Sequence, residues 1–177
     1  MLIISMKSLP KADQHDYAHR LLRECLRAHG IEYSEKTPVI LGKLGKPSLA
    51  EHPHIHYNLT HADGIAACTS GKSECGIDAE RVREYRPNVM KRAFTESEMA
   101  LVENAQIQAK NLIFFRIWTL KEAYVKALGI GISYPLKTIE FLPDGDDINT
   151  NVTGYSFRQY ILRDGEFVVS VCEKDEN

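Results

Sequence analysis

The 177-residue sequence predicts an α+β fold. Segments that alternate like strands and segments with helical periodicity occur in both halves of the chain, without regular β-α-β succession. The length suits one domain, or two small lobes that share a core. A turn-like stretch at residues 71–74 is the expected boundary, which divides the chain into an N-terminal lobe of residues 1–72 and a C-terminal lobe of residues 73–177.

The N-terminal half is expected to contain one helix and a small meander. Apolar residues recur at helical spacing in residues 13–29. Residues 37–48, which contain several glycines and lysines, are expected to form a loop. Strand-like alternation over residues 55–61, 64–70 and 74–80 then predicts an antiparallel meander of three strands.

The C-terminal half begins with two expected helices. Thr95 and Glu98 form the pattern of a capping box, which predicts a helix that runs to about Ala105. The second helix, over residues 111–128, is apolar around most of its surface and is therefore expected to be largely buried. Gly129 stands where a glycine ends a helix.

The last third of the chain is expected to be a polar loop followed by a hairpin. An apolar stretch over residues 139–142 leads into a loop over residues 143–151. Two strands, residues 155–163 and 166–173, then flank the turn-forming pair Asp164-Gly165.

The composition is ordinary for a soluble globular protein, with 44% hydrophobic and 26% charged residues and a net charge of -2. This balance provides no overall attraction to nucleic acid or to a membrane. The apolar start of the chain is interrupted at Lys7, and no later stretch reaches membrane-spanning length. The four cysteines lack CxxC spacing, so we expect reduced thiols and a cytoplasmic protein, although a hairpin at residues 70–73 would allow a Cys68–Cys75 disulfide.

Two acidic segments are the candidates for catalysis. Glu122 and Lys126 are four residues apart in an expected helix, so they emerge on one face, as in many exposed ion pairs. Asp78 and Glu80 are two apart in an expected strand, which points both carboxylates to one side. Such a pair is also typical of a solvated strand end. A magnesium ion would relieve its repulsion, and Glu122 would add a third ligand and leave room for a pyrophosphate.

Three further patterns each admit two interpretations. GKLGKP (residues 42–47) offers backbone N–H groups and Lys43 or Lys46 to a phosphate, but it is not a Walker A loop. The histidines within residues 52–61 suggest zinc, yet they lie too close along one strand to surround a tetrahedral ion. The basic residues within 81–92 would either steer an acidic partner towards the carboxylates or form a solvated face.

Four stretches, in one order along the chain, are similar to motifs of the 4′-phosphopantetheinyl transferases. They are DYAHR (16–20), GKP with NLTH (45–47 and 58–61), GIDAE (76–80) and WTLKEAYVKALGIGIS (118–133). The last two form the specific signature, whereas GKP alone would be weak. The sequence therefore resembles the longer, pseudo-dimeric class of this family, and the resemblance covers most of residues 16–135.

The resemblance implies two similar α+β lobes with the active site between them. It also implies transfer of the 4′-phosphopantetheine arm of coenzyme A to a serine of an acyl or peptidyl carrier protein, with release of adenosine 3′,5′-bisphosphate. By position, Asp78, Glu80 and Glu122 match the family's magnesium ligands, with manganese as the alternative ion. Glu122 also matches the base that takes the serine proton, and Lys126 matches the cation beside the pyrophosphate.

Contacts to coenzyme A are implied in the same way. Lys46 and His61 match residues that contact its phosphates, and Arg20 matches a basic residue near the 3′-phosphate. Relatives of this class commonly carry an extra N-terminal strand and helix with further basic residues for that phosphate, whereas about fifteen residues precede DYAHR here. Either Lys7 or Lys11 would take their place, or the affinity for coenzyme A would be lower. A pseudo-dimer within one chain also implies a monomer.

Two alternatives stay open at this stage. A metal-dependent phosphohydrolase of coenzyme A or a nucleotide would use the same three carboxylates with water as the nucleophile. A non-catalytic module that binds coenzyme A or a carrier protein would keep the fold without turnover.

Overall fold

The computed structural model describes residues 1–176 and has an α+β fold. Its four α-helices are α1 (Lys11–Arg27), α2 (Pro87–Ala93), α3 (Glu96–Asn104) and α4 (Ile107–Leu128). Two 3-10 turns, η1 (Gly131–Ser133) and η2 (Leu136–Thr138), follow α4. The strands are β1 (Leu2–Ser5), β2 (Val39–Leu41), β3 (Pro47–Leu49), β4 (His56–Ala62), β5 (Ile65–Gly71), β6 (Cys75–Arg81), β7 (Phe141–Asp144), β8 (Asp147–Thr150), β9 (Tyr155–Leu162) and β10 (Phe167–Lys174).

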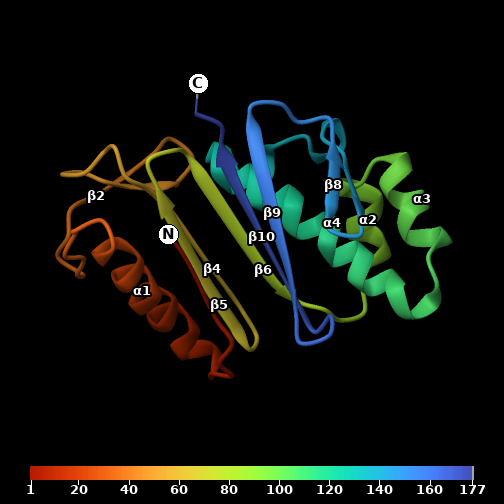
Figure 1. Cartoon of the computed structure of the whole chain (residues 1–177), viewed down its shortest axis with the longest axis horizontal. Coiled ribbons are helices and arrows are strands. Elements are labelled where there is room, and N and C mark those ends of the chain that lie inside the picture. Colours follow the sequence, from red (N-terminus) through yellow and green to blue (C-terminus); the bar gives the residue numbers. More distant parts are fainter. Residues whose placement is uncertain (177) are drawn as a thin grey trace.

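Six of the strands form two three-stranded antiparallel sheets with the same connectivity. The first has the order β1-β5-β4 and the second the order β6-β10-β9. In each, an edge strand leads into a long helix, a small two-stranded sheet follows, and a hairpin supplies the central and the other edge strand. The second sheet differs because α2 and α3 precede its long helix (Figure 1). The chain therefore contains two similar α+β halves.

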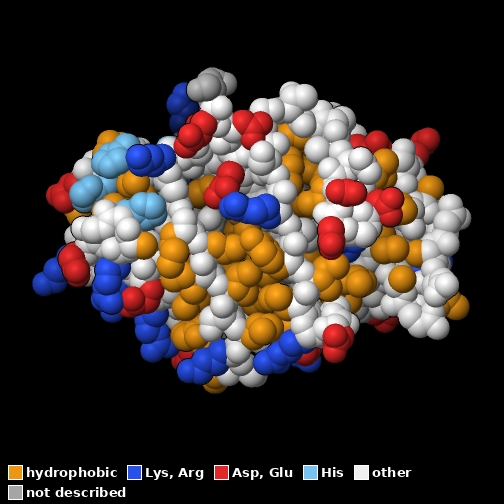
Figure 2. Space-filling model, viewed as in Figure 1, with side chains coloured by type: hydrophobic (Ala, Val, Ile, Leu, Met, Phe, Trp, Pro, Cys, Tyr) orange, Lys and Arg blue, Asp and Glu red, His pale blue; other side chains and the backbone are white. Residues whose placement is uncertain are grey.

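Each long helix covers one face of its own sheet, and the opposite faces share a core. Leu22, Cys25 and Leu26 of α1 are fully buried in a cluster with residues of β4 and β5. Between the two sheets lies a third cluster, made by Ile65, Ala67, Ile77, Ala79, Phe167, Val169 and Val171. On the face seen in Figure 2, hydrophobic side chains gather over these strands. Burial of such apolar surface is the main force that holds the sheets together.

The two sheets meet along β4 and β6. Their backbones do not form a ladder with each other, because β4 pairs with β5 and β6 pairs with β10. Instead, the backbone N–H of Ile77 donates to Oδ1 of Asn58 over 2.8 Å. The side-chain oxygen of Asn58 thus accepts the hydrogen bond of a backbone N–H at this seam, where a buried N–H without a partner would destabilise the fold.

The predicted helices are confirmed, with small shifts at their ends. The helix expected over residues 13–29 is α1, and the capping box of α3 is present with Thr95 and Glu98 bonded reciprocally. The helix expected over residues 111–128 begins four residues earlier, at Ile107, and Gly129 ends it with a φ of 70°. The short helix α2 has no counterpart among the predictions.

Several predicted loops and pairings are wrong. Residues 37–48 contain the β2–β3 hairpin, and residues 143–151 contain most of the β7–β8 hairpin. The predicted meander holds for β4 and β5 only, because β6 belongs to the other sheet. The hairpin around Asp164-Gly165 is confirmed as β9–β10. Within residues 1–176, no helix has both the length and the apolarity needed to cross a membrane.

Candidate functional site

The site is built where α4 lies close against β6. A Cβ atom on Gly76 would overlap the carbonyl oxygen of Ala123 and the backbone nitrogen of Ala127. Only a residue without a side chain allows this approach between helix and strand. Because alternate residues of a strand face one side, Asp78 and Glu80 face α4 as Gly76 does.

Glu122 of α4 completes an acidic group with the two carboxylates of β6. Burial is the largest cause that raises the pKa of Glu122, and the negative charges of Asp78 and Glu80 raise it further. The pKa of Glu80 is also raised, first by burial, while its hydrogen bond to Arg83 acts in the opposite sense. Glu122 therefore senses the charges of both β6 carboxylates, and Glu80 senses that of Asp78, as expected of like charges in a partly dry site.

Lys126 joins this group to both sheets. Its ammonium lies 2.6 Å from Oδ1 of Asp78 and also donates to the Ile77 carbonyl over 3.2 Å. It reaches the hydroxyl of Thr60, in β4, over 3.4 Å. Lys126 stands one turn after Glu122, so one helix presents a carboxylate and a cation to Asp78 and Glu80.

The charges of two carboxylates are balanced by cations of the chain itself. Lys126 pairs with Asp78, and the guanidinium of Arg83 lies 2.7 Å from Oε2 of Glu80. With the side chains in these positions, no three His, Cys, Asp or Glu residues among 1–176 form a group that could hold a metal ion.

The donor set nevertheless fits a hard divalent cation. Oδ2 of Asp78 is buried and has no hydrogen-bond partner in the described structure. Buried carboxylate oxygens are normally satisfied, so this one is available to a ligand. Three carboxylates within electrostatic range of one another are the oxygen donors that Mg²⁺ prefers.

Lys121 does not belong to this site. Although the sequence places it beside Glu122, its side chain points away from the carboxylates and is fully buried. Its ammonium lies 2.8 Å from Glu98 and donates to the carbonyls of Leu136 and Ile139. Lys121 therefore does not share the face of Glu122 and Lys126, because consecutive helical residues point about 100° apart.

A hydroxyl and amide network lies behind the site and has no counterpart among the predictions. The hydroxyls of Thr119 and Ser170 are 2.7 Å apart, and Gln159 bonds both Ser170 and the guanidinium of Arg116. Ser170 is the cross-strand partner of Asp78. The network thus ties α4 to the sheet that carries the carboxylates. Isolated polar residues in apolar segments are the only signal for it in the sequence.

The side chain of Lys46 is bonded to backbone groups of other segments. Its ammonium donates to the carbonyls of Cys75 and Ala127, and burial lowers its pKa. Its aliphatic chain lies against Gly129, where a Cβ would come within 2.9 Å of it. Lys46 therefore links the β2–β3 hairpin to the end of α4.

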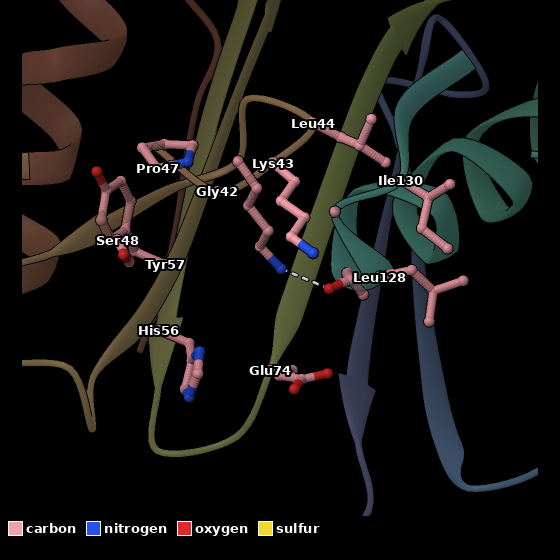
Figure 3. Close-up of a pocket in the computed structure, with 13 residues that line it drawn as sticks. Gly42, Lys43, Leu44, Pro47, Ser48, His56, Tyr57, Glu74, Leu128 and Ile130 are labelled. Carbon is pink, nitrogen blue, oxygen red and sulfur yellow. Dashed lines mark hydrogen bonds between the residues drawn. The ribbon is translucent and has the colours of Figure 1, made fainter. Parts of the chain in front are cut away.

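A pocket of about 400 Å³ lies between that hairpin and the end of α4. Figure 3 shows Lys43 and Leu44 projecting from the hairpin towards Leu128 and Ile130. The lining of the pocket also includes Lys46 and His56. The pocket therefore combines apolar walls with the cations of Lys43 and Lys46. None of the three carboxylates lines it, although Lys46 connects its wall to the strand that carries two of them.

His61 and Arg20 lie on the first half of the molecule. His61 is exposed near the end of β4, and its pKa is lowered first by burial and then by the charges of His15 and Lys126. Arg20 is exposed on α1, with its guanidinium 5.3 Å from the centre of the Tyr17 ring. The structure thus brings His61 into electrostatic range of Lys126, while Arg20 stands on a separate element.

The chain is similar to one family of known proteins. Residues 74–172, more than half of the chain, match the family model described as the 4′-phosphopantetheinyl transferase superfamily. One relative is a 4′-phosphopantetheinyl transferase (gsp) of Aneurinibacillus migulanus, 32% identical over 48% of this chain and 35% of its own length. Another is the transferase HetI of a Nostoc species, 37% identical over 50% of this chain and 40% of its own length.

A solved holo-(acyl-carrier-protein) synthase of Bacillus anthracis is also similar, at 22% identity and a TM-score of 0.49 over 59% of this chain and 97% of that one. The chain spans about half or less of the length of the curated relatives named above. The family match includes all four residues that form the acidic group and its lysine. The chain belongs to the 4′-phosphopantetheinyl transferase superfamily.

Proposed function

We propose that this protein transfers the 4′-phosphopantetheine arm of coenzyme A to a serine of an acyl or peptidyl carrier protein. The observation that carries the proposal is the close packing of α4 on Gly76, which sets Glu122 and Lys126 opposite Asp78 and Glu80. Membership of the transferase superfamily supports the same reaction. The other product would be adenosine 3′,5′-bisphosphate.

Glu122 is the proposed base. Burial and two neighbouring carboxylates raise its pKa above that of a free glutamate, so it accepts a proton more readily near neutral pH. It would take the proton of the carrier serine as the serine oxygen attacks the phosphorus next to the pantetheine arm. The oxygen of the leaving adenosine bisphosphate then departs with the bond electrons.

Lys126 is the proposed support for the leaving group. Its ammonium already neutralises Asp78 and stands one helical turn from Glu122. A fixed cation there offsets the charge that grows on the pyrophosphate oxygen. Because base and cation share one helix, the two ends of the displacement stay aligned without reorganisation.

Asp78, Glu80 and Glu122 would hold a magnesium ion, with manganese as the alternative. A divalent cation bound there would draw charge from the diphosphate of coenzyme A. Arg83 contacts Oε2 of Glu80, so the ion and the guanidinium would share that carboxylate or compete for it. Lys46, His61 and Arg20 are proposed contacts to the nucleotide half, and the pocket beside Lys46 supports a position for it near the seam.

The basic segment after β6 is the proposed docking surface for the carrier. It starts at Arg81, the last residue of β6, and all five of its basic side chains are exposed: Arg81, Arg83, Arg86, Lys91 and Arg92. Carrier proteins that present acidic residues would be attracted to such a surface. A monomer is proposed because one chain contains both halves.

Incubation with coenzyme A, magnesium and an apo carrier protein tests the proposal. Intact-mass spectrometry should show one phosphopantetheine added to the carrier, with none added when the carrier serine is replaced by alanine. Release of phosphate or of a nucleotide without a change in carrier mass would instead identify a phosphohydrolase. Binding of coenzyme A without either product would identify a non-catalytic module.

A further inference from the structure

The carboxylate of Glu80 is already paired with a cation of the chain. Nη1 of Arg83 lies 2.7 Å from Oε2 of Glu80 and also donates to the carbonyl of Arg81 over 2.9 Å. The guanidinium lies over the ring of Phe115, 4.8 Å from its centre. Three contacts thus hold Arg83 against one of the three carboxylates of the proposed metal site.

The two cations that pair with carboxylates of this site are held differently. Lys126 belongs to α4, where its ammonium makes three hydrogen bonds, one of them to Asp78. Arg83 belongs to residues 82–86, which form neither helix nor strand, and its side chain is 58% exposed against 29% for Lys126. An exposed side chain on such a segment can leave its partner without moving a helix or a strand. We therefore expect Lys126 to stay and Arg83 to move when another charge enters the site.

The guanidinium of Arg83 has a second place to go. A cavity of about 210 Å³ adjoins it, and the lining of this cavity includes Glu80, Phe115 and Trp118. The lining also includes Glu84, whose carboxylate is exposed and stands next to Arg83 in the chain. Space and an alternative counter-ion therefore lie beside the present position of the guanidinium.

A divalent cation and the guanidinium would repel each other at Glu80. With the side chains as they are, residues 1–176 contain no group of three His, Cys, Asp or Glu that could hold a metal ion, although Oδ2 of Asp78 is buried and unpaired. The side chains must therefore rearrange before an ion binds. Release of Glu80 from Arg83 frees a carboxylate oxygen and removes a positive charge in one movement.

We propose that Arg83 is an internal counter-ion that competes with the divalent metal for Glu80 and so sets the metal affinity of the free protein. This inference rests on the metal site proposed above. Without metal, the guanidinium neutralises Glu80 and holds its carboxylate in the position seen here. Metal binding exchanges this contact for the ion. Arg83 acts through Glu80 and is therefore a positioning residue.

Titration with Mn²⁺ in the absence of coenzyme A, with free Mn²⁺ measured by electron paramagnetic resonance, tests the proposal. Arg83→Gln should bind Mn²⁺ about tenfold more tightly than the unaltered protein, because it removes both the competitor for Glu80 and a positive charge near a divalent ion. Arg83→Lys keeps the charge but lacks the planar fork, so its affinity should lie between the other two. Circular dichroism should be the same for all three proteins.

The single tryptophan of the chain reports the movement itself. Trp118 lines the same cavity as Arg83, so departure of the guanidinium from Glu80 should change the tryptophan emission. Titration of the unaltered protein with Mg²⁺ should therefore produce a saturable change in emission. In Arg83→Gln the change should be much smaller, since no guanidinium leaves. A purely structural role of Arg83 would not remove this signal while strengthening metal binding.

Arg81→Gln is the matched control, because it removes an equal charge from the residue next to Glu80, whose guanidinium pairs instead with Asp63 and Glu166. At about 0.15 M salt it should change Mn²⁺ affinity by less than about twofold, since charges that are not in contact are largely screened. Equal affinity of Arg83→Gln and the unaltered protein, or an equal gain in both glutamine variants, overturns the proposal and leaves the metal site standing. Absence of Mn²⁺ binding from every protein overturns the metal site and this inference together, whereas the carrier assay tests transfer separately.

Discussion

At the scale of single residues, Glu122 is held in surroundings that disfavour its charged form. It is partly buried beside two other carboxylates, and only Lys126 offsets their combined charge from the same helix. Residues held in such unfavourable surroundings are frequent at active sites, because the interactions that perturb them serve chemistry.

Replacing Glu122 with glutamine should therefore abolish transfer and make the fold more stable. At pH 7 the thermal midpoint should rise by about 2–4 °C, the change that about 1 kcal/mol produces in a chain of this size. The raised pKa means that ionisation costs stability as pH rises through the folded pKa. Below the unfolded value of 4.5, Glu122 is protonated in both states, and the variant should match the unaltered protein.

Scanning calorimetry at pH 7 and pH 4 measures this difference, and the carrier assay measures transfer. The exposed loop residue Glu51, replaced with glutamine, is the control and should change neither quantity. A variant that melts below the unaltered protein at pH 7 would contradict the electrostatic account, and unchanged transfer would remove Glu122 from the mechanism.

The sequence could predict the acidic residues because they follow simple spacing rules. Asp78 and Glu80 share a strand face by alternation, and Glu122 and Lys126 share a helix face by their separation of four. That Lys46 binds carbonyl groups could not be predicted, since its partners are backbone atoms of distant segments. The same limit applies to the contact between Arg83 and Glu80, which depends on the turn after β6.

At the scale of elements, the approach of α4 to β6 depends on one missing side chain. Substitution of Gly76 with alanine would place a Cβ against backbone atoms of α4, which cannot rotate away as a flexible side chain could. We expect a loss of about 3 kcal/mol from this overpacking. Transfer should fall as well, because α4 must shift away from Asp78.

Gly71 provides the matched control. It ends β5, and a Cβ there would meet no atom within 4 Å. Its replacement with alanine should change the free energy of unfolding by less than about 0.5 kcal/mol. Urea denaturation of both variants measures these energies, and equal stability of the two would contradict the tight contact at Gly76.

The long elements could be predicted and the short ones could not. The helices α1 and α4 carry many turns of periodic apolar residues, and α3 has its capping box. The strands of the two small sheets have three or four residues each, too few to show alternation. The missed helix α2 has seven residues and follows a proline-bearing basic segment that resembles a loop.

At the scale of the whole molecule, the two halves meet along β4 and β6, where the side-chain amide of Asn58 accepts a hydrogen bond from a backbone N–H. We expect Asn58→Ala to leave the Ile77 N–H without a partner, at a cost of about 1–3 kcal/mol. Thermal unfolding should move down by several degrees, and hydrogen exchange at Ile77 should become faster. Asn88→Ala, which alters an exposed asparagine in α2, should change neither. Unaltered exchange at Ile77 in the Asn58 variant would contradict this role.

The α+β class could be predicted from the sequence, whereas the repetition of connectivity in the two sheets could not be derived from sequence spacing. The two halves share an order of elements, but α2 and α3 interrupt the second half and obscure the correspondence. The pairing of β6 with β10 joins residues nearly a hundred positions apart, which local patterns do not reveal. We propose that the lobe boundary lies between β5 and β6, at residues 72–73.

The seam between β4 and β6 divides the residues around the proposed site between the two halves. All three carboxylates and Lys126 belong to the half built on β6 and α4, where a backbone ladder and a glycine contact fix them. Thr60 and His61 belong to the other half. A rotation of one half against the other would therefore change the distances from Thr60 and His61 to the carboxylates, while the distances among the carboxylates and Lys126 would stay the same.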